Sequence, residues 1–167
     1  YILQKINTSV FKEPAALMEN IEKGNLKWDE MITISENASS MGGSQILLET
    51  GEEMSVDDLL KGITIASGND AVFALAEAIA GTHENFVKMM NDKLKELGLK
   101  DSNFKNCHGL DEEGHYSSAY DIAVMAKELM KHQMVTDYST VWMDSLRNGE
   151  SELVNTNKLV RFYEGAT

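Results

Sequence analysis

The sequence predicts a mainly α protein with few strands. Apolar residues recur at helical spacing through the middle of the chain, small polar residues that favour helix starts precede those stretches, and β-branched alternation is confined to short segments. With 167 residues, 43% of them hydrophobic and 25% charged, the chain has the size and composition of a single globular domain with a buried core. It contains no internal repeat and no domain boundary.

The first part of the chain carries the weakest signals. Tyr1–Asn7 is short and apolar, which favours a strand, and Ala15–Lys23 is expected to be a helix that ends at Gly24. Met31–Ser35 alternates and is β-branched, so it is a candidate short strand. Glu36–Gln45 is small, polar and glycine-containing, and we expect a loop there.

The middle of the chain predicts four helices, bounded by polar residues that cap a helix start or by glycines that end one. They are Val56–Ala66 after Ser55 with Asp58, Asp70–Ala80 before Gly81, a third between Thr82 and Gly98, and a fourth opened by Ser118 with Asp121. The Asp70–Ala80 segment is apolar almost all round, and such helices are normally buried. We therefore expect it to be the central helix, enclosed by the helices that carry Val56, Phe86 and Ile122.

The last part of the chain is less clear. Val135–Arg147 fits no single period, and we expect a looser helix that carries Trp142. Glu152–Thr167 combines a short apolar run with turn-forming residues.

Charge and cysteine usage exclude several classes of function. The formal net charge is −12, and an acidic surface repels phosphate backbones, so we expect no nucleic-acid partner. Cys107 is the only cysteine, which rules out an intrachain disulfide and a zinc cluster of thiolates. The four histidines lack the spacing of a ligand pair, so neither a metal nor a cofactor is expected. No apolar run reaches the ~20 residues that cross a bilayer.

Ser67-Gly68-Asn69 is a polar tripeptide between two strongly apolar helical segments. On spacing alone, the commoner interpretation is a turn between helices, with Asn69 as the N-cap of the second one. Buried polar side chains need partners, however, and a hydroxyl and an amide at this junction could also face a cleft. The three residues by themselves leave both interpretations open.

Four longer stretches together resemble one protein family. They are ENASSMGGSQILLETGEEMSVDDLLKGITIASGNDA, FVKMMNDKLKELGLKDSNFKN, HGLDEEGHYSSAYDIAVMAKELMK and LVNTNKLVRFYEGAT. The family is the low-molecular-mass penicillin-binding proteins with D-alanyl-D-alanine carboxypeptidase activity, close to those of spore-forming Gram-positive bacteria. The resemblance covers roughly Met18 to Thr167. It implies the helical subdomain plus a partial sheet of the β-lactamase/DD-peptidase α+β fold, a single incomplete catalytic domain over residues 1–167, and a place outside the membrane in the cell envelope.

The resemblance also implies a chemistry. In this family a serine of an S-x-x-K motif attacks the bond between two D-alanines of a peptidoglycan stem peptide, without metal or cofactor, and β-lactams bind the intact enzyme. An S-x-N motif adds a second hydroxyl and an amide, and a K-T-G strand binds the substrate carboxylate. Ser67, Gly68 and Asn69 match S-x-N. Ser67 is thereby expected to relay a proton to the leaving amine, and the Asn69 amide to hold a substrate carbonyl.

The other two motifs do not match in the same way. The family pattern places S-x-x-K between the residues that match Ala15 and Ala16, and K-T-G beyond Thr167. Ser9 and Lys12 have S-x-x-K spacing, but they precede the Pro-Ala lead-in of the motif, so we do not expect them to be the catalytic pair. We therefore expect this chain alone to be inactive.

Two further expectations follow. The alternative to an enzyme is a degenerate, non-catalytic family member that binds peptidoglycan or a protein partner. In addition, loss of the nucleophile helix and sheet would leave apolar surface near Asp70–Ala80 uncovered, which predicts a homodimer or a poorly soluble monomer.

Overall fold

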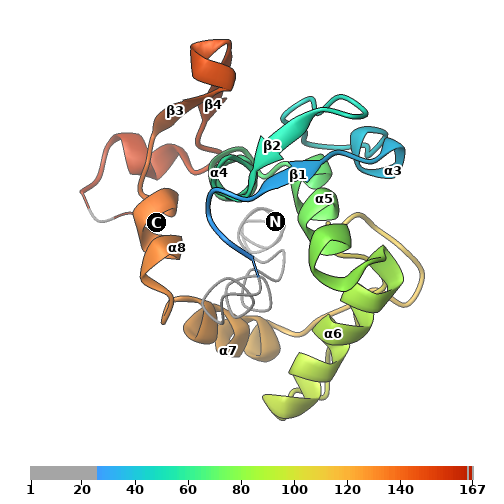
Figure 1. The fold of residues 1–167 in the computed structure, drawn as a ribbon. Helices are drawn as coiled ribbons and strands as arrows, with labels where there is room; N and C mark the ends of the chain where they lie inside the picture. The colour runs from blue at the N-terminus through green and yellow to red at the C-terminus, as the bar shows by residue number, and fades with distance from the viewer. Residues whose placement is uncertain (1–25, 165, 167) are drawn as a thin grey trace.

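The computed structural model describes residues 26–164 and 166, and this part of the chain is mainly helical (Figure 1). The α-helices are α3 (Glu36–Ser39), α4 (Val56–Ala66), α5 (Asn69–Ala80), α6 (His83–Glu96), α7 (Ala119–Leu129) and α8 (Gln133–Ser139), and two short 3₁₀ helices are η1 (Arg147–Gly149) and η2 (Lys158–Arg161). The predicted fold class, mainly α with few strands, is confirmed. None of these helices is long and apolar enough to cross a membrane.

The strands form two small antiparallel sheets. β1 (Met31–Thr33) pairs with β2 (Glu53–Ser55), and β3 (Met143–Leu146) pairs with β4 (Ser151–Val154). Helix α4 packs against strands of both sheets, and Figure 1 shows it between β2 and the β3–β4 hairpin.

Local capping explains where three of the helices begin. The Ser55 hydroxyl accepts a hydrogen bond from the Asp58 N–H at 3.1 Å, and the Ser118 hydroxyl does the same for Asp121 at 3.1 Å. Thr82 caps α6 in the same way. Each bond satisfies a backbone N–H that has no partner inside the helix. These three predicted helix starts are confirmed.

The first two-thirds of α5 lie in the core. Residues 69–76 of this helix are buried, and Phe86, Met90 and Leu94 of α6 join them. Helix α5 packs against α4 and α6, as expected. The helix that carries Ile122, α7, was expected to be the third neighbour of α5, and this prediction is wrong. The main contacts of α5 include α3 and not α7. One reason is that the Ser35 hydroxyl, which caps α3, donates to Glu77 of α5 at 2.6 Å.

Two other predictions need correction. The expected loop 36–45 begins with α3, because Ser35 caps this helix and Ala38, one of its own residues, is buried. The expected looser helix 135–147 is a short helix, α8, followed by a strand, β3; Trp142 lies between them. Periodicity missed β3 because its pairing partner, β4, lies further along the chain. The predictions for Tyr1–Asn7 and Ala15–Lys23 fall outside the described residues.

Candidate active site at the junction of α4 and α5

Ser67 ends helix α4 in an unusual backbone conformation. Its φ of 59° and ψ of 37° are left-handed, a position that glycine or asparagine normally takes after a helix. Its N–H donates to the Ile63 carbonyl at 3.0 Å, and the Gly68 N–H donates to the Gly62 carbonyl at 3.0 Å. A serine persists in this conformation only where its surroundings determine it, and such residues cluster at functional sites.

Asn69 is the first residue of α5, and its side chain does not cap the helix. The N-cap is Gly68, which has no side-chain bond to offer. The Asn69 Nδ2 group donates to the Gly42 carbonyl at 2.6 Å, and the Asn69 backbone N–H donates to the Ser44 carbonyl at 2.7 Å. The interpretation of Asn69 as a simple N-cap is therefore wrong. Asn69 instead fastens the segment 42–44 to the start of α5.

Gly43 leaves the space that Asn69 occupies. Its φ is 84°, and a Cβ atom at this position would lie 2.5 Å from Asn69 Nδ2 and 3.3 Å from Leu110 Cδ2. Glycine is needed here both for the conformation and for the close approach. Three separate parts of the chain thus meet: the segment 42–44, the tripeptide 67–69 and Leu110. The tripeptide 67–69 was recognisable in the sequence, whereas the Gly42-Gly43 pair was the only local signal for the segment 42–44.

Asp70, next to Asn69 in the first turn of α5, is a residue of this junction whose role the sequence did not indicate. Its side chain is completely buried and accepts from the Ile46 N–H at 3.1 Å, the Leu48 N–H at 3.1 Å and the Ala71 N–H at 2.9 Å. A carboxylate in the first turn of a helix is also favoured by the helix dipole. Asp70 therefore ties residues 46–48 to the same helix start that presents Asn69. The signal for it in the sequence was an aspartate at the start of an apolar, and therefore buried, helix, where its carboxylate must accept hydrogen bonds from nearby N–H groups.

Ser67 and Asn69 are both buried, with 6% and 3% of their surface exposed. Hydrogen bonds to backbone carbonyls fix the main chain of both residues and the side chain of Asn69. This arrangement can hold a hydroxyl and an amide in fixed positions. That is the requirement for groups that relay a proton and orient a carbonyl.

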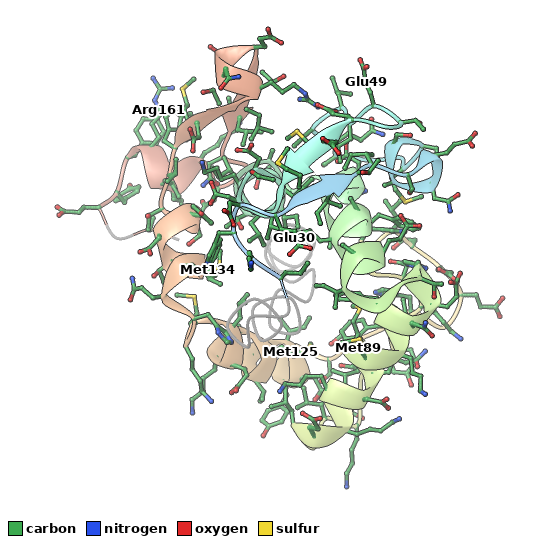
Figure 2. All side chains as sticks on the ribbon, in the orientation of Figure 1. Glu30, Glu49, Met89, Met125, Met134 and Arg161 are labelled. Carbon is green, nitrogen blue, oxygen red and sulfur yellow. The ribbon has the colours of Figure 1, made fainter. Side chains whose placement is uncertain are left out.

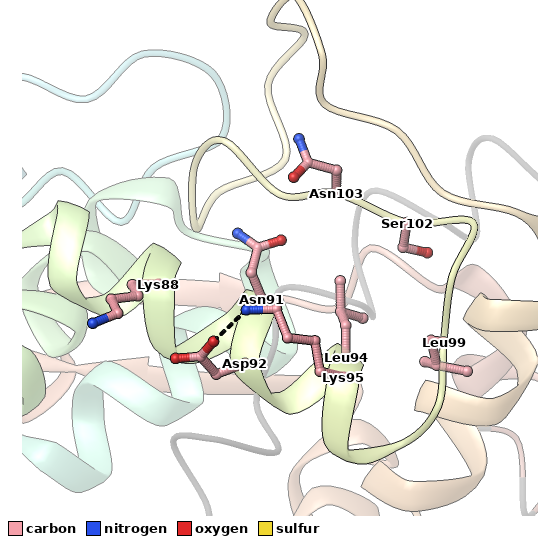
Figure 3. A pocket seen from close by; sticks show the side chains of 8 residues that line it. All are labelled: Lys88, Asn91, Asp92, Leu94, Lys95, Leu99, Ser102 and Asn103. Carbon is pink, nitrogen blue, oxygen red and sulfur yellow. Dashed lines mark hydrogen bonds and ion pairs between the residues drawn. The ribbon is translucent and has the colours of Figure 1, made fainter.

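A pocket of 350 Å³ lies elsewhere, along α6 and the segment that follows it (Figure 3). Three of its polar side chains already make structural bonds: Lys95 pairs with Asp92 at 2.7 Å, and Asn91 bonds to both backbone groups of Phe104. We assign it no function.

His83 also serves the structure. His83 stacks on Phe73 with ring centroids 4.8 Å apart, and its Nε2 accepts the Cys107 N–H at 3.3 Å. The described residues contain no group of three side chains that could hold a metal ion.

Comparison with known proteins shows the family. Residues 4–166 match the D-alanyl-D-alanine carboxypeptidase family. D-alanyl-D-alanine carboxypeptidase DacF of Bacillus subtilis is 57% identical over 152 residues, which are 89% of this chain and 39% of that protein. DacA of Escherichia coli is 34% identical over 145 residues, 78% of this chain and 36% of that protein. The chain thus spans less than half the length of these curated relatives.

Solved structures agree with the sequence relatives. Penicillin binding protein 5 from Haemophilus influenzae superposes with a TM-score of 0.85 at 30% identity, over 93% of this chain and 46% of that one. Penicillin binding protein 6B from Escherichia coli gives a TM-score of 0.83 at 33% identity, over 92% of this chain and 50% of that one. The α+β fold implied by the sequence resemblance is confirmed. The chain belongs to the D-alanyl-D-alanine carboxypeptidase family.

Proposed function

We propose that this chain is the larger part of the helical half of a serine-type D-alanyl-D-alanine carboxypeptidase, and that Ser67-Gly68-Asn69 is its S-x-N element. The substrate is a peptidoglycan stem peptide ending in D-alanyl-D-alanine, and the protein works outside the membrane, in the cell envelope. Residues 1–167 belong to one catalytic domain. β-Lactams, which acylate the nucleophile of penicillin-binding proteins, are its inhibitors.

In the proposed reaction, a serine nucleophile attacks the carbonyl carbon of the penultimate D-alanine. The bond to the terminal D-alanine breaks, and an acyl-enzyme ester forms. The nucleophile loses its proton to a neighbouring base, and Ser67 passes a proton to the nitrogen of the departing D-alanine, which leaves as a neutral amine. Water then hydrolyses the ester. The Asn69 amide holds a carbonyl of the peptide during both steps.

The observation that carries this proposal is the pair of unusual features at the α4–α5 junction. Ser67 is held in a left-handed conformation, and the Asn69 side chain is bonded to Gly42 in place of capping its own helix. A left-handed residue is common where a helix ends, but it is usually glycine or asparagine and not serine, and a simple turn does not need the bond from Asn69 to Gly42. Both features fit a site that must present a hydroxyl and an amide at fixed positions.

The test uses the protein expressed from the full reading frame and a tripeptide ending in D-Ala-D-Ala, with release of D-alanine as the measure. Ser67→Ala should lower turnover by about 10²–10⁴-fold with little loss of stability, as is typical of positioned catalytic groups. Asn69→Ala should lower turnover as much and also cost about 1–3 kcal/mol of stability, because the Gly42 carbonyl loses its donor. Ser118→Ala is the matched control: this serine caps α7, so its loss should cost about 1 kcal/mol of stability and no turnover.

Two outcomes would contradict the proposal. An Asn69→Ala variant that melts early but keeps wild-type turnover would make Asn69 a structural residue only. A reading frame without an S-x-x-K serine, in a protein that binds peptidoglycan without cleaving it, would favour the degenerate, non-catalytic alternative. The expected homodimer stays a prediction for sedimentation analysis. Phe73 and Leu75 of α5, however, are buried within the single chain and offer no uncovered apolar surface to drive it.

A further inference from the structure

Residues 46–48 run between two oppositely charged side chains. On one side, the Asp70 carboxylate accepts the N–H groups of Ile46 and Leu48. On the other side, the Arg147 guanidinium donates to the carbonyls of Ile46, at 3.3 Å, and of Leu47, at 3.1 Å. The two side chains come from α5 and from the loop of the β3–β4 hairpin, so the segment joins two distant parts of the fold.

Arg147 is held firmly in this position. Its Nε lies 2.5 Å from Oε1 of Glu52 and its Nη2 lies 2.9 Å from Oε2, while Nη1 donates to the Ser151 hydroxyl at 3.0 Å. Both members of the pair are about four-fifths buried, with side-chain exposures of 20% and 19%. The hydrogen bond to Glu52 raises the pKa of Arg147, and the nearby charge of Asp70 adds to this effect. A planar guanidinium can make all of these bonds at once, and an ammonium cannot.

Leu47 shows what these bonds hold in place. Its φ is 58°, a left-handed conformation that leucine rarely adopts, and 74% of its surface is exposed. Its neighbours Ile46 and Leu48 are buried. The conformation of Leu47 therefore cannot come from packing of its own side chain. The bonds from Arg147 and Asp70 on either side must determine it.

The same segment leads directly to the candidate active site. Gly42 and Ser44 carry the two carbonyls that bind Asn69. Ile46 packs onto the site from the other direction, because Cβ atoms added at Gly62 and Gly68 would lie 2.7 Å and 3.2 Å from its side chain. A change in the backbone at Leu47 would therefore displace both the partners of Asn69 and the residue that covers Gly68.

We propose that Arg147 is a positioning residue for the carboxypeptidase reaction: from the β3–β4 hairpin it holds Leu47 in its left-handed conformation and thereby fixes the segment 42–48 against Asn69. Arg147 acts through this segment and touches no substrate. The inference rests on the proposed function, because it concerns the rate of that reaction.

The test compares three variants of the protein from the full reading frame. Arg147→Gln should lower the rate of D-alanine release, and of acylation by a fluorescent penicillin, by about 10- to 100-fold, since small misplacements of catalytic groups cost this much. Adding Leu47→Gly to Arg147→Gln should restore most of the rate, because glycine adopts a positive φ without external support. Arg161→Gln is the control: this arginine stacks on Trp142 and Phe162, and Figure 2 shows it well separated from the 46–52 loop that carries Glu49.

If Arg147 only stabilised the fold, its loss would lower the melting temperature without the loss of rate and its recovery in the double variant. All rates are therefore measured well below the melting temperature of each variant, where the protein is folded. Amide hydrogen exchange supplies a readout that does not depend on activity. The N–H groups of Ile46 and Leu48 should lose protection in Arg147→Gln and regain it in the double variant.

The outcomes separate the two proposals. Wild-type rates in Arg147→Gln, or a double variant no faster than Arg147→Gln, would overturn the role of Arg147. Unchanged protection of Ile46 and Leu48 in Arg147→Gln would overturn it as well, even in an inactive protein. A wild-type protein that neither releases D-alanine nor reacts with penicillin would contradict the proposed function, and the exchange data would still decide whether Arg147 holds the segment.

Discussion

Replacement of Asp70 by alanine should be among the most damaging single changes in this chain. The side chain is completely buried, and its carboxylate accepts the N–H groups of Ile46, Leu48 and Ala71. Each buried N–H that loses its acceptor costs about 1–3 kcal/mol, and bonds to a charged acceptor are at the upper end. Allowing for partial rearrangement, we expect a loss of about 3–5 kcal/mol in the free energy of unfolding, or a melting temperature lower by about 10 °C.

Urea and thermal unfolding followed by circular dichroism measure this loss directly. Asp70→Asn keeps the shape and one acceptor oxygen but turns an amide N–H₂ toward backbone donors, so it should fall between the wild type and the alanine variant. Asp29→Ala, at an exposed position, is the control and should change stability by less than about 0.5 kcal/mol. An Asp70→Ala variant within about 1 kcal/mol of the wild type would refute the reasoning.

Two further predictions follow from contacts in the structure, and a third follows from the sequence motifs. Gly62→Ala should destabilise the protein by about 1 kcal/mol, measured by urea unfolding, because the clash of the added methyl with two atoms of Ile46, at 2.7 Å and 3.1 Å, outweighs the better helix propensity of alanine; an unchanged midpoint would contradict this. Glu52→Gln should remove stability that depends on pH, because the bond from Arg147 holds the pKa of Glu52 below its ordinary 4.5. The contribution of this bond, about 1–2 kcal/mol, is present above pH 4.5 and is lost as the pH falls below it. A stability difference between wild type and variant that stays constant across this range would be the contrary result. Incubation of this chain alone with a fluorescent penicillin should give no covalent adduct by mass spectrometry, whereas an adduct on Ser9 would make Ser9 and Lys12 the S-x-x-K pair.

Features that depend on neighbouring residues were predictable from the sequence. The caps at Ser55, Thr82 and Ser118 act three residues along the chain, and the helices they start were found with their correct beginnings. The apolar stripe of α6 was found for the same reason, since helical periodicity is local.

Features that depend on distant partners were not predictable in this way. Strand β3 forms only by pairing with β4. The short helix α3 is held against α5 by the hydrogen bond from Ser35 to Glu77, 42 residues further along the chain. In the candidate site, Ser67 and Asn69 were found through the family resemblance and not through their spacing. The bond from Asn69 to Gly42 spans 27 residues, and the bond from Arg147 to Ile46 spans 101, so no local pattern could indicate either.

The central claim is that Asn69 holds a carbonyl of the substrate in a D-alanyl-D-alanine carboxypeptidase. A crystal structure of the protein from the full reading frame, acylated by a penicillin, tests it most directly. The account predicts the β-lactam side-chain carbonyl within hydrogen-bonding distance of Asn69 Nδ2, with the bond from Asn69 to Gly42 retained. An acyl group attached at a serine remote from the α4–α5 junction, with Asn69 making no contact to it, would contradict the account.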